Sequence, residues 1–481
     1  MKRILYWFRN DLRLHDNEGF YRATQDADEV IPVYCFDLRL FRPLRQPAIQ
    51  KTGVFRAQFL LESVADLRNN LIELGGNLIV RTGHPEQVLW EMARDLQADA
   101  IYASKEVTQE ETEVESGLSK RLKGINVDIE LFWESTLYHV RDLPFNVSRM
   151  PDVFTSFRQQ IENKVRVRPT FPLPDPISVP REIEVGELPE LAQLGFSELP
   201  AADPRAAISF RGGERAGLER LRHYFWGEDH LRNYKETRNG MLGTDFSSKF
   251  SAWLALGCLS PRHVYEEVRR YESERIANDS TYWLVFELLW RDFFRFIALK
   301  YGTRIFKPGG IKMRLGHPFV EDRALFDRWA NGQTGVPLID AAMRELNATG
   351  FLSNRARQNV ASFLIHDLNL NWTWGAAYFE AMLTDYDPAS NWGNWCYTAG
   401  VGNDPRPNRY FNIYSQALRY DEQGEYVRHW LPELARVPAD RIHRVWTLNP
   451  AEQDEYGLHL GTDYPLPIIN ADKWLSPESI R

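Results

Sequence analysis

Hydrophobic residues follow two alternating periods over the first 135 residues of the chain. Short runs rich in β-branched and aromatic residues alternate with longer stretches in which apolar residues recur every three or four positions. This alternation predicts a doubly wound α/β domain, in which a parallel sheet carries helices on both faces. The expected strands are residues 4–8, 30–36, 77–80, 100–103 and 127–132, and the expected helices are residues 54–74, 85–96 and 108–122.

The pattern changes twice further along the chain. Between residues 141 and 207 neither period persists, and prolines recur from Pro169 to Pro204, where they interrupt helices and remove backbone donors. We expect a long connector that crosses the protein surface here. From residue 211 onward nearly every segment has helical periodicity. The clearest helical segments are residues 214–224, 282–300, 337–346, 354–368 and 375–383.

The length of 481 residues also favours two domains, because a single core stops growing at roughly 250–300 residues. We expect an α/β domain at residues 1–135, an interdomain linker at 136–210 and an all-helical domain at 211–481. No GxGxxG fingerprint follows the first predicted strand, so an NAD-type site is unsupported.

Net charge and cysteine usage restrict the class of protein. With a net charge of −8, a nucleic-acid partner would need a local basic patch. The cysteines, Cys35, Cys258 and Cys396, lie far apart without a CxxC pair, which disfavours disulfides, zinc and iron–sulfur clusters. We expect a cytoplasmic protein without a membrane span. The candidate patch is Arg211, Arg215, Arg220, Arg222, Arg232, Lys235 and Arg238, although such a run is also typical of a solvated helix face.

One polar loop offers donors for phosphate. Thr244, Ser247, Ser248, Lys249 and Ser251 lie directly before a predicted helix, whose N-terminus would add favourable dipoles. The glycine spacing is not that of a P-loop. Because Ser and Thr are also the preferred N-cap residues, an ordinary helix cap explains the same residues.

One predicted helix combines charged and aromatic side chains on a single face. Glu287, Trp290 and Arg291 share this face, and further phenylalanines surround them. Charges amid so much apolar surface are typically paired in or beside a cavity rather than solvated. An exposed Glu–Arg pair at this spacing would be a common surface feature.

Two later segments add ligand-binding side chains. Asn354, Arg357 and Gln358 share a helix face and could contact a ligand, although a polar helix surface explains them as well. Asp385 and Asp387 form a DxD pair, but no histidine joins them at ligand spacing, so we expect no metal. The carboxylates could instead accept hydrogen bonds from sugar or ribityl hydroxyls and balance Arg357.

Tryptophans are concentrated in the same region. The chain has 15 Trp, and Trp372, Trp374, Trp392 and Trp395 lie within a short stretch that ends at Tyr397. Oxidisable rings so close in sequence suit electron hopping to and from a redox cofactor. Tryptophans packed in a helical core would give the same pattern.

Five motifs together resemble those of the photolyase/cryptochrome family. They occur in the family's order and spacing over essentially the whole chain, which makes the combination highly specific. Residues 150–158 and the strings 402–406 and 409–412 are similar to the DASH cryptochromes, as are Gln358 and Tyr397, which stand where dimer photolyases commonly have Met and Trp. The five family motifs are residues 9–17, 247–251 with 259–262, 287–293, 340–346 and 430–434.

The resemblance implies a U-shaped FAD in the helical domain and light-driven repair of cyclobutane pyrimidine dimers, preferentially in single-stranded DNA. Asn391 would face the flavin N5, and the chain would act as a monomer, with RNA and duplex DNA as weaker partners. The implied FAD contacts are Tyr234, Thr244, Ser247, Ser248, Lys249, Ser251, Arg291, Arg357, Asp385, Asp387 and Asn391. The implied lesion contacts are Glu287, Trp290, Asn354, Gln358 and Tyr397, of which Glu287 and Asn354 are catalytic.

The resemblance also implies an antenna and an electron-transfer chain. A methenyltetrahydrofolate antenna would sit between the domains, with Glu106 as its candidate contact. Trp395 and Trp372 match the proximal and middle members of the family's tryptophan chain, but Phe319 stands where the distal Trp is expected. Because Phe is much harder to oxidise than Trp, we expect photoreduction to be slow or rerouted, for example through Trp374.

The sequence leaves a second function open. A blue-light photoreceptor that signals through its flavin redox state would share the same motifs. The retention of Glu287 and Asn354 favours the repair enzyme, because those residues carry the pocket chemistry that repair requires.

Overall fold

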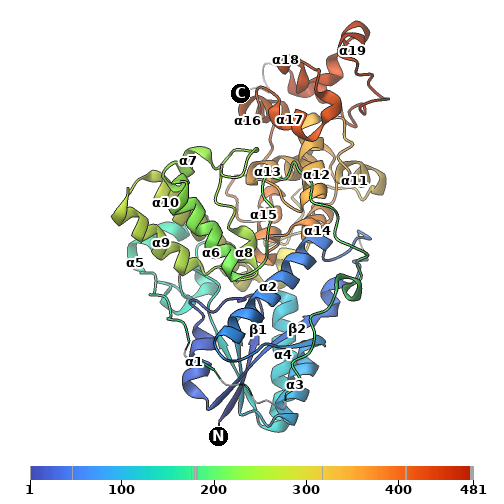
Figure 1. Ribbon diagram of the computed structural model, residues 1–481. Helices are drawn as coiled ribbons and strands as arrows, with labels where there is room; N and C mark the ends of the chain where they lie inside the picture. The colour runs from blue at the N-terminus through green and yellow to red at the C-terminus, as the bar shows by residue number, and fades with distance from the viewer. Residues whose placement is uncertain are drawn as a thin grey trace.

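A five-stranded parallel sheet forms the core of the N-terminal domain in the computed structural model, which describes residues 2–476 except 46, 175, 178, 180–182, 317 and 407–408. The strand order is β3-β2-β1-β4-β5, and four helices cover the two faces (Figure 1). The predicted doubly wound architecture is confirmed. The strands are β1 (Arg3–Phe8), β2 (Glu29–Asp37), β3 (Ile79–Gly83), β4 (Ala100–Ser104) and β5 (Asp128–Phe132), and the helices are α1 (Glu18–Asp26), α2 (Val54–Glu73), α3 (Pro85–Asp95) and α4 (Gln109–Leu122).

The second half of the chain is helical, as the periodicity predicted. Its longest member is α10 (Asp279–Tyr301), which packs against α9, α7 and α15. No helix within the described ranges is long and apolar enough to span a bilayer. The other helices are α6 (Glu214–Arg222), α7 (Tyr234–Thr237), α8 (Ser251–Ala255), α9 (Pro261–Glu274), α11 (Arg323–Ala330), α12 (Pro337–Thr349), α13 (Asn354–Ser362), α14 (Trp372–Met382), α15 (Pro388–Thr398), α16 (Ile413–Tyr420), α17 (Glu425–Trp430), α18 (Ala439–Ile442) and α19 (Pro450–Tyr456).

Two details differ from the sequence-based expectation. The segment after residue 141 contains a regular helix, α5 (Phe154–Lys164), because Phe154, Phe157 and Ile161 form an apolar face that is buried against α10. The apolar spacing persists there because no proline lies between Pro151 and Pro169. The predicted helix 354–368 is split into α13 and a π-helical turn at Phe363–Asp367.

The connector runs beside the edge of the sheet. Val80 of β3 donates its backbone N–H to Val185 at 2.8 Å, and Arg68 donates to the carbonyl of Gly186 at 2.8 Å. The exposed edge of β3 is thereby covered, which removes unpaired backbone donors that could recruit another strand.

The segment that follows β1 is wedged between the two domains. Leu12 donates its backbone N–H to Leu256 at 3.1 Å, and Asp16 pairs with Arg262 at 2.6 Å. Gly257 has φ +67°, and a Cβ at this position would lie 2.0 Å from the carbonyl oxygen of Asn10. The chain therefore requires glycine at this close approach of the two domains.

Candidate functional site

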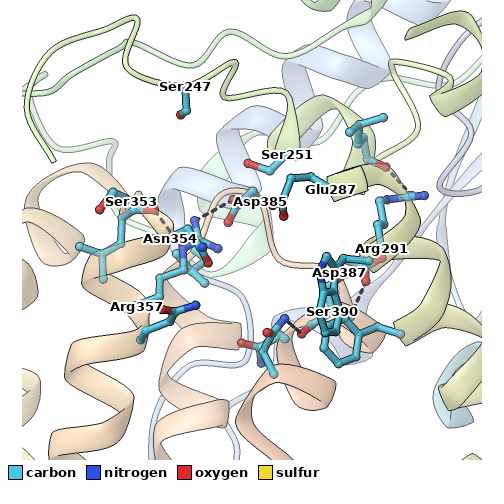
Figure 2. Close-up of a pocket in the computed structure, with 18 of the residues that line it drawn as sticks. Ser247, Ser251, Glu287, Arg291, Ser353, Asn354, Arg357, Asp385, Asp387 and Ser390 are labelled. Carbon is cyan, nitrogen blue, oxygen red and sulfur yellow. Dashed lines mark hydrogen bonds and ion pairs between the residues drawn. The ribbon is translucent and has the colours of Figure 1, made fainter. Parts of the chain in front are cut away.

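A cavity of about 650 Å³ lies within the helical domain, between α10, α13, α15 and the loop before α8. Figure 2 shows Ser247 and Ser251 on one side of it, Arg357 and Asp385 on another, and Glu287 near the middle. Most of the residues proposed from the sequence meet here, although they come from five separate segments. The predicted residues that line it are Tyr234, Ser247, Ser248, Lys249, Ser251, Glu287, Trp290, Arg291, Asn354, Arg357, Gln358, Asp385, Asp387, Asn391, Trp395 and Tyr397.

Three predicted residues lie outside the cavity lining. Thr244 is exposed, and its hydroxyl donates to the carbonyl of Ala207 at 2.8 Å. Trp372 lies behind the wall, with its ring 6.0 Å from that of Trp392. Glu106 is buried in the N-terminal domain. These positions do not place any of the three in direct contact with a ligand in the cavity.

The polar loop is held by an arginine that sequence reasoning had assigned only to a candidate surface patch. Arg220 pairs with Asp245 at 2.7 Å and donates to the carbonyls of Ser247 and Ser248. The helix that follows, α8, has only five residues, so its N-terminus contributes less dipole than expected. The loop geometry therefore depends more on Arg220 than on the helix.

Lys249 has an unusual backbone and an unusual environment. Its φ is +56°, in the left-handed region, and its ammonium donates to the carbonyls of Gly243 and Thr244. Burial, together with the positive charge of Arg220, lowers the pKa of Lys249 to about 7. An anion bound at the loop would favour the charged form of this lysine.

Arg357 and Asp385 form the predicted pair at 2.7 Å. The second carboxylate oxygen of Asp385, Oδ1, is buried and has no hydrogen-bond partner among the described residues. An unsatisfied acceptor of this kind, in a residue that lines the cavity, favours a ligand that brings an N–H or O–H donor. A flavin carries both a ring N–H and ribityl hydroxyls, so the residues present fit it.

Glu287 pairs with Arg238 at 2.5 Å rather than with Arg291, which is one helical turn away. Arg291 instead donates to the backbone carbonyls of Ser135 and Leu254. Burial raises the pKa of Glu287, although Arg238 opposes the shift. The carboxyl group can therefore remain protonated to a higher pH than an ordinary glutamate.

Aromatic and basic side chains lie together on another part of the lining. The rings of Trp290 and Tyr397 meet edge to face at 6.0 Å, and the Arg409 guanidinium lies 4.7 Å from the Tyr397 ring. Asp404 accepts hydrogen bonds from both Arg406 and Arg409. The sequence indicated Trp290 and Tyr397 but gave no sign that these two arginines line the same cavity.

Trp395 is the tryptophan of the predicted electron-transfer chain that reaches the cavity. Its ring lies 5.2 Å from Phe379 and 6.4 Å from Trp329. Trp329 is fully buried and was not among the residues proposed from the sequence. Trp374 contacts Phe326 at 5.6 Å. The structure therefore places one further oxidisable ring, Trp329, beside the inner tryptophan.

Comparisons with known proteins match both halves of the chain. A family model described as DNA photolyase matches residues 4–176, and one described as the FAD binding domain of DNA photolyase matches residues 283–476. A cryptochrome DASH of Gloeobacter violaceus is 53% identical over 470 residues, which cover 98% of this chain and 93% of the relative. A cryptochrome DASH of Synechocystis is 52% identical over 472 residues, which cover 97% of this chain and 95% of the relative.

Solved structures show the same relationship. The crystal structure of a Synechocystis cryptochrome matches with a TM-score of 0.95 and 51% identity, over 100% of this chain and 98% of that chain. A bacterial class III photolyase from Agrobacterium tumefaciens matches with a TM-score of 0.85 and 28% identity, over 98% and 95% of the two chains. The likeness therefore extends over both domains.

The chain belongs to the photolyase/cryptochrome family, a class of flavoproteins with an α/β domain and a helical FAD-binding domain. Relatives at about half identity over nearly the whole length carry the name cryptochrome DASH, which confirms the subfamily that the motifs indicated. The match over residues 283–476 supports FAD as the cofactor, and membership supports a photolyase-like or cryptochrome function that involves DNA.

Proposed function

We propose that this protein repairs cyclobutane pyrimidine dimers in light, preferentially in single-stranded DNA, and that it does so as a cytoplasmic monomer. The observation that carries the proposal is the cavity itself, in which a half-buried acid, Glu287, shares the lining with the aromatic rings of Trp290 and Tyr397. When bound and reduced, FAD would supply the light-driven electron transfer that splits the dimer without net redox change.

The chain's own residues would hold the lesion. A flipped-out dimer stacks on Trp290 and Tyr397, which offsets part of the unstacking free energy. Glu287, when protonated, donates a hydrogen bond to a pyrimidine carbonyl, and the amides of Asn354 and Gln358 complete the polar contacts. This arrangement discriminates a dimer from a single base by shape and by its paired carbonyls.

The preference for single strands follows from the balance of free energies. Extruding a dimer costs a few kcal/mol, and the cost is least where no partner strand must be displaced. A chain with net charge −8 has only local basic groups, such as Arg238, Arg406 and Arg409, with which to bind phosphates. RNA and duplex DNA are therefore the weaker partners.

We assign the FAD contacts from the same lining. Ser247, Ser248, Lys249 and Ser251 would hold the diphosphate and ribityl groups, together with Tyr234, while Thr244 supports the loop from outside. Arg291, Arg357, Asp385, Asp387 and Asn391 would lie beside the isoalloxazine ring.

A second chromophore would act as an antenna that absorbs light and passes the energy to the flavin. We propose 5,10-methenyltetrahydrofolate at the carboxyl edge of the sheet, with Glu106 as its contact. Addition of this folate to the purified protein should introduce a new absorption band and sensitised flavin emission. Neither change would appear if the carboxyl edge of the sheet does not bind the folate.

The deciding experiment is dimer repair by anaerobically reduced protein under blue light and in darkness. Matched single- and double-stranded oligonucleotides should give light-dependent repair that is confined to the single strand. A protein that retains FAD and binds the lesion but repairs neither substrate would instead be a photoreceptor that signals through its flavin.

A further inference from the structure

A chain of three buried charged groups joins the two domains behind the cavity wall. Arg295 donates from Nη2 to Asp387 at 2.7 Å and from Nη1 to Glu106 at 3.2 Å. The side chains of Glu106, Arg295 and Asp387 are 1%, 3% and 6% exposed. Asp387 lines the cavity, whereas the other two residues lie outside its lining. Through Arg295, Glu106 of the N-terminal domain is thus linked to a residue of the cavity lining.

The Glu106 end of this chain lies at the switch point of the sheet. β1 and β4 are neighbours, and the chain leaves them toward opposite edges, which is where doubly wound domains bind ligands. Asn10, just after β1, donates to Glu106 at 3.2 Å and to Glu111 at 3.1 Å. The carboxylate of Glu106 is therefore fixed by the ends of both strands, while the guanidinium of Arg295 arrives from the other domain.

The Asp387 end controls a helix that carries cavity residues. Asp387 is the N-cap of α15, and its Oδ1 accepts the backbone N–H of Ser390 at 2.7 Å. Asn391 and Trp395, which follow on α15, line the cavity. A shift of the Asp387 carboxylate would therefore move the first turn of this helix and the side chains on it.

Two buried guanidinium groups and several carboxylates lie together in this cluster, where Asp292 and Glu111 add to Asp387 and Glu106. Arg291 lies one turn before Arg295 on α10, and burial together with the charge of Arg295 lowers the pKa of Arg291 to about 10. Asp387 and Glu106 compensate the two guanidinium groups. The Nε of Arg295 has no partner among the described residues, so the two carboxylates alone fix its orientation.

We propose that Arg295 is a positioning residue through which Glu106 of the N-terminal domain sets the place of Asp387 and of the first turn of α15. This inference rests on the proposed FAD site, since FAD retention is its first readout. It assigns a role in flavin binding to Glu106, a residue that does not line the cavity.

The proposed connection runs from Glu106 through Arg295 to Asp387, and we call it the relay. It is tested by measuring flavin affinity in darkness, without folate and without substrate. Glu106→Gln should weaken FAD binding about five- to tenfold, within the usual range for coupling between sites. The matched control is Asp16→Asn, which removes an equally buried interdomain pair, Asp16–Arg262, that does not reach the cavity. This control should bind FAD within about twofold of the wild type, although it unfolds at a lower temperature.

Combined variants separate a relay from two independent effects. Because Glu106 would act only through Arg295, Glu106→Gln combined with Arg295→Gln should bind FAD no more weakly than Arg295→Gln alone. Arg295→Lys keeps the positive charge but cannot donate to both carboxylates in the same geometry. FAD binding by this variant should therefore stay weak. Full FAD retention in Glu106→Gln, an equal loss in Asp16→Asn, or additive losses would overturn the proposal.

A second readout does not depend on FAD. In the flavin-free protein, the amides of Ser390 and Asn391 should exchange hydrogen faster in Glu106→Gln than in the wild type or in Asp16→Asn. If the wild type retained no FAD, the proposed cofactor site would fail, and this measurement would still decide the relay. Unchanged exchange in Glu106→Gln would contradict it.

Discussion

The carboxylate of Glu287 lies 2.5 Å from the guanidinium of Arg238, a residue from another segment, and not beside its helical neighbour Arg291. The pair lies on the lining of the cavity, where burial raises the pKa of Glu287. Arg238 could release the acid toward a lesion and engage a phosphate instead. The acid is thus held by a basic residue that lines the same cavity.

Glu287→Ala should reduce repair by about 10- to 100-fold at saturating single-stranded substrate, because a hydrogen-bond donor to the dimer is lost. Glu287→Gln, whose amide still donates, should retain more activity. Wild-type repair should fall as pH rises through the raised pKa of Glu287, whereas repair by Glu287→Gln should not. Parallel pH profiles for the two proteins would exclude a protonated Glu287 as the donor.

Lys249 should make FAD affinity depend on pH. Burial, the charge of Arg220 and the opposing charges of Asp245 and Glu345 place its pKa at about 7, so binding of an anionic diphosphate draws a proton onto the amine. FAD affinity should therefore decrease as pH rises above 7, as equilibrium titration can measure.

Two variants of Lys249 provide the controls. Lys249→Arg stays charged and should bind FAD with little pH dependence, while Lys249→Met should bind weakly at every pH. Neighbouring Glu345, whose pKa burial raises to about 8, titrates in the same range. Glu345→Gln should therefore be compared, and a pH dependence that survives in Lys249→Arg would point to Glu345.

Loss of the Arg357–Asp385 pair should release FAD. Arg357→Ala leaves a buried carboxylate without its cation, so FAD binding should weaken by tenfold or more, corresponding to about 1.4 kcal/mol or more. Asp385→Asn removes the negative charge but keeps a hydrogen-bond acceptor, so its loss of FAD binding should be smaller. Flavin absorbance after gel filtration measures the FAD retained by each variant. A larger loss in Asp385→Asn than in Arg357→Ala would contradict this account of the pair.

Photoreduction should respond to the aromatic substitutions in a defined order. Trp395→Phe should abolish it, and Phe319→Trp should accelerate it by restoring an oxidisable ring at the expected distal position. Trp374→Phe should slow it if the electron path is rerouted there. Repair that starts from chemically reduced protein should be unaffected in Trp374→Phe and Phe319→Trp, and photoreduction that is equally fast in Trp374→Phe and the wild type would exclude the rerouting.

Gly257→Ala should destabilise the junction between the domains. The added methyl group would meet the backbone of Asn10 at 2.0 Å, and the residue also has a positive φ. Gly195→Ala is a suitable control, because Gly195 has φ +94° with nothing within 4 Å of its added Cβ. The control should lose only about 1 kcal/mol of unfolding free energy in a denaturant titration, and Gly257→Ala distinctly more.

The sequence predicted those helices and strands whose apolar residues recur with a clear local period. All five strands of the sheet occur where the apolar runs indicated them, since a parallel sheet covered on both faces needs continuous apolar segments. Helix α5 was not predicted, because the apolar spacing of Phe154, Phe157 and Ile161 covers only a short stretch between Pro151 and Pro169. The domain limits at 135 and 210 remain predictions.

The site was predictable only where a motif singled out its residues. Ser247, Arg357 and Asp385 lie in motifs or polar clusters, and they line the cavity as expected. Arg220 and Arg238 act through partners from other segments, so one-dimensional spacing could not reveal their contacts.

The wedge formed by the residues after β1 has a consequence for how the protein can be divided. Arg13 donates to the carbonyl of Gly257, and Asp16 is enclosed by Arg262 and Ser260 of the other domain. If the chain were cut in the connector, each half would expose an apolar face that also carries charged groups without their partners. The two domains should therefore behave as one cooperative unit rather than as exchangeable modules, and neither should dissolve well without the other.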